Sequence, residues 1–125
     1  MRLLLDTHAL LWALADPEHL REEAREAVRD GRNEVLVSAA SIWEISIKQA
    51  AGKLRAPGDL LEAITAAGFG PLPISARHAL AAGLLPAYHR DPFDRMLIAQ
   101  ARAESLTIVT RDLRFKPYGQ DLLAA

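Results

Sequence analysis

The sequence predicts an α/β protein, a three-layer α/β/α sandwich around a central, mostly parallel sheet. Short apolar runs typical of buried strands alternate along the chain with longer stretches typical of helices. Strands that alternate with helices are joined by right-handed crossovers, which place helices on both faces of a sheet. No repeat and no linker divides the 125 residues, so we expect residues 1–125 to form a single domain.

The first half of the chain is expected to begin with a strand that leads directly into a helix. In chain order we expect a strand over 2–5, helices over 7–15 and 20–30, a strand over 34–37 and a helix over 38–53. The first apolar run ends abruptly at Asp6. Asp16-Pro17 interrupts the first helix and Gly31 closes the second. The third helix is rich in Ile and contains Trp43, so we expect protein to surround most of it.

The second half is expected to be mainly helical. We expect helices over 59–67, 75–84 and 92–105, a strand over 106–110, and irregular structure in the last fifteen residues. Residues 68–74 contain two glycines and two prolines. A strand there would lie at the edge of the sheet, because proline cannot donate a hydrogen bond to a neighbouring strand.

Composition excludes several classes of function. The chain has no cysteine, so a disulfide scaffold, a thiolate zinc site and a cysteine nucleophile are ruled out. Fifteen Lys and Arg against sixteen Asp and Glu give a net charge of −1, so nucleic acid would have to bind local patches. No apolar run approaches the ~20 residues of a membrane helix, and Asp6 comes too early for a signal peptide. We therefore expect a cytoplasmic protein without a membrane segment.

Four acids stand apart from the charged helix over 20–30, because apolar sequence surrounds each of them: Asp6, Glu44, Asp94 and Asp112. Each has a structural alternative, as a helix cap, as part of a capping box beginning at Ser41, or as a turn residue. Asp6 and Asp112 nevertheless follow strands, and Glu44 and Asp94 lie near helix starts. In a parallel sheet these positions meet at the carboxyl edge, so the four acids can converge there.

A cluster of this kind needs protons or a cation. Two carboxylates about 5 Å apart repel by roughly 3 kcal/mol at an effective dielectric of about 20. The dipole of a helix returns only about 0.3–1 kcal/mol to an acid in its first turn. Ligands that offer only oxygen suit Mg²⁺ or Mn²⁺ better than zinc.

Four blocks of sequence carry a resemblance to a known family. They are Leu-Leu-Leu-Asp-Thr-His over 3–8, Ser-Ala-Ala-Ser-Ile-Trp-Glu-Ile-Ser-Ile-Lys over 38–48, Asp-Pro-Phe-Asp-Arg-Met-Leu-Ile-Ala-Gln-Ala over 91–101, and Ile-Val-Thr-Arg-Asp over 108–112. In this order, from residue 2 to about 117, the chain resembles the PIN domain and, more narrowly, the VapC-type toxin ribonucleases of toxin–antitoxin pairs. The resemblance implies an endoribonuclease dependent on Mg²⁺ or Mn²⁺. Such an enzyme hydrolyses RNA phosphodiesters with metal-activated water and leaves 5′-phosphate and 3′-hydroxyl ends.

The resemblance also implies roles for individual residues. The catalytic, metal-binding acids fall on Asp6, Glu44, Asp94 and Asp112. Asp91 competes with Asp94, which we choose because it lies directly before the Ala-rich stretch of the helix, while Asp91 makes the better N-cap. Thr110 and Asp91 are expected as auxiliary residues beside these acids.

Several basic residues lie near these blocks and are candidates for contacts with RNA phosphates. We expect Lys48, Arg95 and Arg111 in this role, with Arg90, Arg114 and Lys116 nearby. Lys48 has the alternative of pairing with Glu44, four residues earlier. His8 is close enough to Asp6 to approach the cleft, but a structural role is favoured for it. The other three histidines, His19, His78 and His89, do not have the spacing of metal ligands. We therefore assign no histidine to the metal.

The resemblance further implies a VapB-like antitoxin, whose C-terminal segment blocks the cleft, and a homodimer. The apolar residues that offer a receptive surface are more typical of a core: Leu11, Trp12, Leu14, Trp43 and Ile47. Two alternatives stay open, a catalytically inert PIN-like module that binds RNA or protein, and a metal-dependent phosphatase or phosphotransferase. The presence of all four acids disfavours the first, and His8 stands where the haloacid-dehalogenase pattern has a second Asp.

Overall fold

A five-stranded parallel sheet forms the centre of the molecule in the computed structural model, which describes residues 1–125. The strands are β1 (Arg2–Leu5), β2 (Glu34–Ser38), β3 (Gly70–Leu72), β4 (Thr107–Thr110) and β5 (Leu122–Ala124). They lie in the order β3-β2-β1-β4-β5, and every neighbouring pair is parallel. Leu5, at the end of β1, pairs with Val37 on one side and Val109 on the other. The carboxyl ends of the three central strands therefore meet at one edge.

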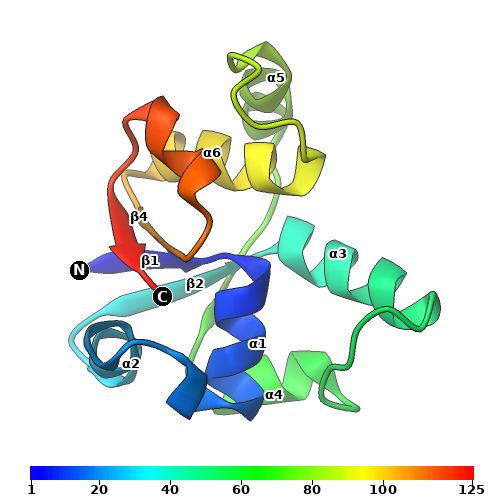
Figure 1. Ribbon diagram of the computed structural model, residues 1–125, viewed down its shortest axis with the longest axis vertical. Helices are drawn as coiled ribbons and strands as arrows, with labels where there is room; N and C mark the ends of the chain where they lie inside the picture. Colours follow the sequence, from blue (N-terminus) through cyan, green and yellow to red (C-terminus); the bar gives the residue numbers. More distant parts are fainter.

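Helices cover both faces of this sheet, as predicted (Figure 1). They are α1 (Thr7–Ala15), α2 (Glu22–Arg29), α3 (Ala39–Ala50), α4 (Leu60–Ala66), α5 (Ala76–Leu84) and α6 (Pro92–Glu104), with 3-10 segments η1 (Pro17–His19) and η2 (Leu113–Tyr118). Figure 1 shows α1, α2 and α4 on one side of the sheet and α5 and α6 on the other. None of the helices combines the length and the apolar character required to span a membrane.

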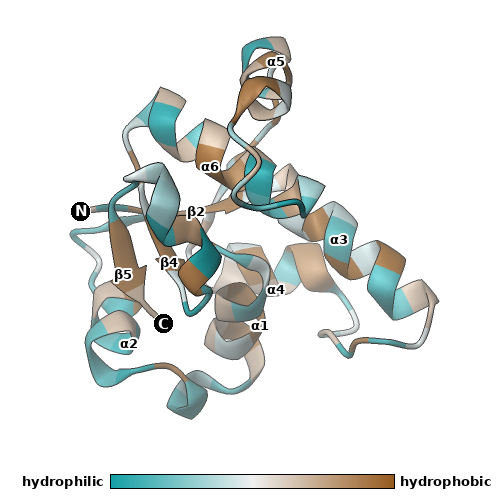
Figure 2. Cartoon of the chain, turned by 45° about the horizontal axis from the view of Figure 1, so that its top comes forward, coloured by the Kyte–Doolittle hydropathy of each residue, from teal (hydrophilic) through white to brown (hydrophobic).

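The three leucines of β1 show why both faces of the sheet are apolar. Successive side chains of a strand point to opposite faces. Leu3 and Leu5 belong to the core beneath α1, whereas Leu4 belongs to the core beneath α6, and all three are fully buried. Figure 2 shows the contrast with α2, which carries mainly hydrophilic residues. Ala24 is the one buried residue of this helix.

The bounds of two helices differ from the predicted ones by more than one residue at an end. The helix expected over 20–30 begins at Glu22, because Pro17 starts a separate 3-10 turn and Leu20, in extended conformation, is buried in the core. The helix expected over 38–53 ends at Ala50 and is capped by Ser38, whose Oγ accepts a hydrogen bond from the Ala40 N–H. A capping box beginning at Ser41, the structural alternative for Glu44, is therefore not formed. Glu44 lies in the second turn of α3.

The last fifteen residues were expected to be irregular, and this prediction is wrong. They contain η2 and the edge strand β5, which pairs with β4 from Ile108 to Thr110. The strand is only three residues long, and hydrogen bonds from β4 rather than a local pattern define it. The other edge strand, β3, lies within the 68–74 segment where the prolines predicted it.

Candidate active site

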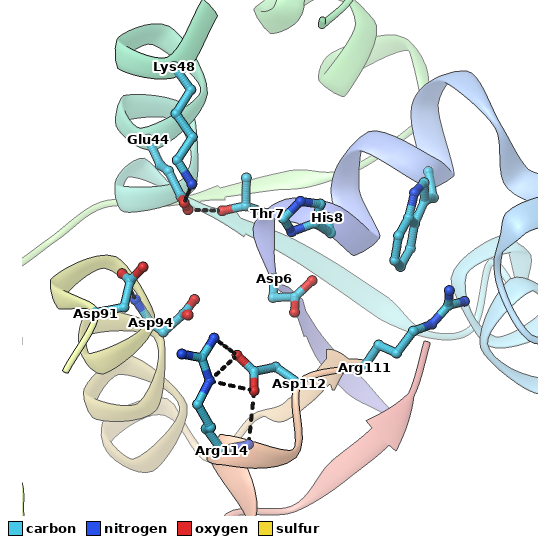
Figure 3. Close-up of a pocket in the computed structure, with 11 residues that line it drawn as sticks. Asp6, Thr7, His8, Glu44, Lys48, Asp91, Asp94, Arg111, Asp112 and Arg114 are labelled. Atoms are coloured by element: carbon cyan, nitrogen blue, oxygen red, sulfur yellow. Dashed lines mark hydrogen bonds and ion pairs between the residues drawn. The ribbon is translucent and has the colours of Figure 1, made fainter. Parts of the chain in front are cut away.

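A polar pocket of about 420 Å³ lies at the carboxyl edge of the sheet (Figure 3). All four acids that the sequence singles out line it, together with Asp91. They come from four parts of the chain: Asp6 follows β1, Glu44 belongs to α3, Asp94 to the first turn of α6, and Asp112 begins η2. The remaining lining residues are Thr7, His8, Trp12, Lys48, Arg111 and Arg114.

Asp6 is buried beside the end of β1 and caps α1. Its Oδ1 accepts a hydrogen bond from the Ala9 N–H at 2.8 Å, and its Oδ2 accepts one from the Thr110 hydroxyl. Burial nevertheless raises the pKa of Asp6, because removal from water outweighs these two bonds. The Thr110 Oγ also accepts a hydrogen bond from the Asp112 N–H at 3.0 Å. Thr110 thus links two of the acids, as an auxiliary residue would.

Glu44 is almost fully buried, and each of its oxygens has a different partner. The Thr7 hydroxyl donates to Oε1, and the Lys48 ammonium donates to Oε2. This ion pair raises the pKa of Lys48. Lys48 therefore makes the pair with Glu44 that was its alternative, and it also lines the pocket. The role of Thr7 was missed, because only the packing of α1 against α3 brings its hydroxyl to Glu44.

Asp94 is the acid most affected by its neighbours. Burial, followed by the nearby charges of Asp91 and three further acids, raises the pKa of Asp94 to about 8. Asp91 caps α6, since its Oδ1 accepts hydrogen bonds from the Phe93 and Asp94 N–H groups at 2.8 and 3.2 Å. At neutral pH and without a cation, the cluster therefore holds a proton on Asp94.

Asp112 differs from the other three because an arginine neutralises it. The Arg114 guanidinium donates through Nε and Nη2 to both carboxylate oxygens, and the Arg114 N–H donates to Oδ1 at 2.9 Å. These hydrogen bonds lower the pKa of Asp112. Asp112 is the only one of the four acids that is paired with an arginine.

His89 is a residue of this site that the sequence did not reveal. Its side chain is fully buried, and its Nε2 lies 2.9 Å from Asp94 Oδ2 and 3.3 Å from Asp112 Oδ2. Its Nδ1 accepts a hydrogen bond from the Asp91 N–H at 3.2 Å, which assigns the proton of a neutral ring to Nε2. His89, Asp94 and Asp112 each offer an atom that could bind a metal ion, and these three atoms lie within 4.8 Å of one another. The only feature of the sequence that could have indicated a role for His89 in this site is its position close to Asp91 and Asp94.

Two of the basic residues predicted to contact RNA phosphates, Arg95 and Arg111, make other contacts in the structure. Arg95 does not line the pocket: its guanidinium donates to carbonyl oxygens around the α5–α6 connection, and this geometry argues against a contact with RNA phosphates. Arg111 does line it, but its guanidinium lies 4.3 Å over the Trp12 ring and donates to the Ala125 and His19 carbonyls. Exposed His8 packs its ring 5.8 Å from Trp12.

The apolar residues proposed as a receptive surface divide into two groups. Leu11 is buried in the core, and Trp12 and Leu14 pack partly against it. Trp43 and Ile47 are exposed on α3, at 60% and 45%. The two residues of α3 are therefore the most exposed of the five.

The fold and the pocket together define a class of protein: the chain belongs to the PIN domain family, whose model matches residues 3–120. Among curated proteins it is similar to Ribonuclease VapC22 of Mycobacterium tuberculosis, with 29% identity over 122 residues that cover 92% of this chain and 90% of the relative. Among solved structures it is similar to DNA-bound VapBC from Salmonella typhimurium, with a TM-score of 0.70, 20% identity, and 98% and 97% of the two chains covered. VapBC2 from Rickettsia felis, bound to a DNA fragment from its promoter, gives a TM-score of 0.69 at 16% identity, with 98% of each chain covered. At these identities the structural likeness shows the fold.

Proposed function

We propose that this protein is a metal-dependent endoribonuclease, the toxin of a VapBC-type pair. The observation that carries the proposal is the convergence of Asp6, Glu44, Asp94 and Asp112 on one open polar pocket. Membership of the PIN family and the similarity to a relative named as a ribonuclease support it.

The residues of the pocket fit a hard divalent cation. The acids offer only oxygen atoms, the ligands that Mg²⁺ and Mn²⁺ prefer. Burial and crowding of negative charge together keep a proton on Asp94, and the crowding is relieved when a cation takes the place of that proton. Asp6, Glu44, Asp94 and Asp112 would hold the ion. A bound divalent ion supplies a more acidic water for attack on phosphorus and offsets charge on the scissile phosphate.

The chain's own residues orient these acids and meet the substrate. Thr110 fixes Asp6, Thr7 fixes Glu44 and His89 fixes Asp94. Lys48 and Arg111 line the rim, where they would contact RNA phosphates. We propose products with 5′-phosphate and 3′-hydroxyl ends and an action in the cytoplasm, where RNA substrates are available.

The proposed biological setting includes a partner. Two of the solved structures to which this chain is similar are named as VapBC, and we propose a VapB-like antitoxin for this protein as well. The exposed Trp43 and Ile47 on α3 are the residues we would place in that contact. The homodimer that the family resemblance implies stays a prediction.

The test is cleavage of labelled RNA by the wild type and an Asp6→Asn variant, in Mg²⁺, in Mn²⁺ and in EDTA. We expect cleavage only with metal, and a rate for Asp6→Asn at least ~100-fold lower, because loss of a supporting residue beside a metal already costs about 10–100-fold. Asparagine keeps an acceptor for the Ala9 N–H, so the variant should fold.

The matched control is Asp59→Asn, because Asp59 caps α4 through the Glu62 N–H and does not line the pocket. It should cleave at the wild-type rate. Equal activity of Asp6→Asn and wild type would contradict the site. Binding of RNA without cleavage would instead favour an inert module, and release of terminal phosphate a phosphatase.

A further inference from the structure

Arg114 neutralises Asp112 in the pocket, and we propose that it is a displaceable cation. In this proposal Arg114 leaves Asp112 when a divalent ion binds there, and its guanidinium then contacts a phosphate of the RNA. The inference rests on the proposed function, since it names a binding residue for that substrate.

Asp112 has no free acceptor oxygen while Arg114 is in place. Oδ1 accepts from the Arg114 N–H at 2.9 Å and from Nε at 3.0 Å. Oδ2 accepts from Nη2 at 2.8 Å and lies 3.3 Å from His89 Nε2. Asp6, by contrast, has one donor on each oxygen. A carboxylate oxygen accepts about two hydrogen bonds, so a cation can reach Asp112 only by replacing the guanidinium.

Arg114 is the positively charged side chain of this pocket that can move most easily. Its guanidinium has no hydrogen-bond partner other than Asp112, and its side chain is 66% exposed. Lys48 is held against buried Glu44, and Arg111 by two carbonyls and Trp12. Exposed ion pairs are weak, so rotation of Arg114 away from Asp112 does not disturb the fold.

The position of the Arg114 guanidinium also favours a contact with phosphate. Figure 3 shows the guanidinium against Asp112, on the side of Asp94. Negative charge on the acids of the pocket, Asp91 among them, also favours the guanidinium. Once a divalent ion neutralises these acids, that attraction is lost. A phosphate that enters the pocket then provides the nearest negative charge, and arginine binds phosphate in a bidentate manner.

The chain contains a matched pair that serves as a control. Asp30 accepts from the Arg32 N–H at 3.0 Å, from Nε at 3.1 Å and from Nη2 at 2.8 Å, which is the same spacing and geometry as Asp112 and Arg114. Arg32 does not line the pocket. Any effect of Arg114→Gln that Arg32→Gln lacks is therefore due to the pocket.

The first experiment titrates Mn²⁺ by calorimetry into the wild type, Arg114→Gln and Arg32→Gln, without RNA. We expect Arg114→Gln to bind Mn²⁺ about fivefold more tightly, the factor that an exposed ion pair of good geometry accounts for. Arg32→Gln should match the wild type. Unchanged or weaker Mn²⁺ binding by Arg114→Gln would overturn the proposal. Thermal unfolding of each variant confirms that it is folded.

The second experiment measures RNA binding against salt concentration with Ca²⁺, with the RNA verified to be intact afterwards. For single strands each phosphate contact contributes about 0.7 to the slope of log K against log salt. Arg114→Gln should lower the slope by about this amount, and Arg32→Gln should not. An unchanged slope would overturn the proposal even if Mn²⁺ binds more tightly. Absence of RNA cleavage by the wild type would instead refute the proposed function, which the Mn²⁺ titration does not require.

Discussion

At the residue scale, a different donor orients each carboxylate of the pocket. Thr110 donates to Asp6, Thr7 to Glu44 and Arg114 to Asp112, while His89 Nε2 lies between Asp94 and Asp112. Such partners fix the direction in which each acid presents its oxygen atoms to the pocket. His89 is buried and lies against two of the acids, Asp94 and Asp112.

Replacement of His89 is predicted to slow cleavage without abolishing it. We expect His89→Leu to lower kcat about 10–100-fold with little change in KM for RNA, because Asp94 and Asp112 lose a shared donor while the RNA contacts remain. His89→Gln, whose amide can still donate to Asp94, should recover part of the loss. Steady-state kinetics with folded variants tests this. Two equally impaired variants would indicate a purely structural role.

At the element scale, the connection between α5 and α6 carries His89 and is held by side chains rather than by regular structure. The Arg95 guanidinium donates to four carbonyl oxygens at 2.8–3.1 Å, those of Ala82, Leu85, Pro86 and His89, and lies 3.5 Å from a fifth, that of Gly83. The Tyr118 hydroxyl donates to the Pro86 carbonyl and accepts from the His89 N–H. Arg95 therefore supports the site through this connection.

Arg95→Lys is predicted to destabilise the protein. A lysine presents a single ammonium and cannot reach four carbonyls in the fork geometry of arginine. We expect the free energy of unfolding to fall by about 1–3 kcal/mol, since carbonyls lose their donors. Urea unfolding measures this, with Arg90→Lys in the same connection as the exposed control. Equal stability of Arg95→Lys and Arg90→Lys would contradict this role of Arg95.

At the scale of the whole molecule, a chain with a net charge of −1 gathers five carboxylates at one edge of its sheet. Both Asp6 and Asp94 have a raised pKa in this arrangement. The folded protein thus binds protons that the unfolded chain has already released, so its stability depends on pH.

Without metal, stability is predicted to fall as pH rises from about 5 to 8.5. Asp94 titrates near 3.8 when unfolded and at about 8 when folded, so its contribution is complete at low pH and is lost as pH rises through 8. Asp6 acts in the same direction, whereas the lowered pKa of Asp112 affects stability only in more acidic solution.

The measurement for this prediction is thermal unfolding in EDTA across the pH range. Mn²⁺ should restore the stability lost near pH 8, because the cation binds only the folded protein. Asp94→Asn should flatten the dependence. A melting temperature in EDTA that rises over this range would contradict the raised pKa of Asp94.

The fold and the four acids could be predicted because they depend on local signals. Apolar runs that alternate with helical stretches predict the parallel sheet, and an acid at the end of a strand is visible in sequence. The prolines of the 68–74 segment likewise locate the edge strand. The strand at residues 122–124 was missed because its hydrogen bonds come from β4, more than ten residues away in sequence.

The amino-acid sequence alone predicts the central strands of the sheet, its helical layers and the identity of the acids that meet at one edge. The partners of those acids depend on tertiary packing. It directs Thr7 to Glu44, brings His89 between Asp94 and Asp112, and turns Arg95 away from the pocket. The physical reason is that a hydrogen bond requires atoms within about 3 Å, and packing of whole elements sets such distances between residues far apart in the chain.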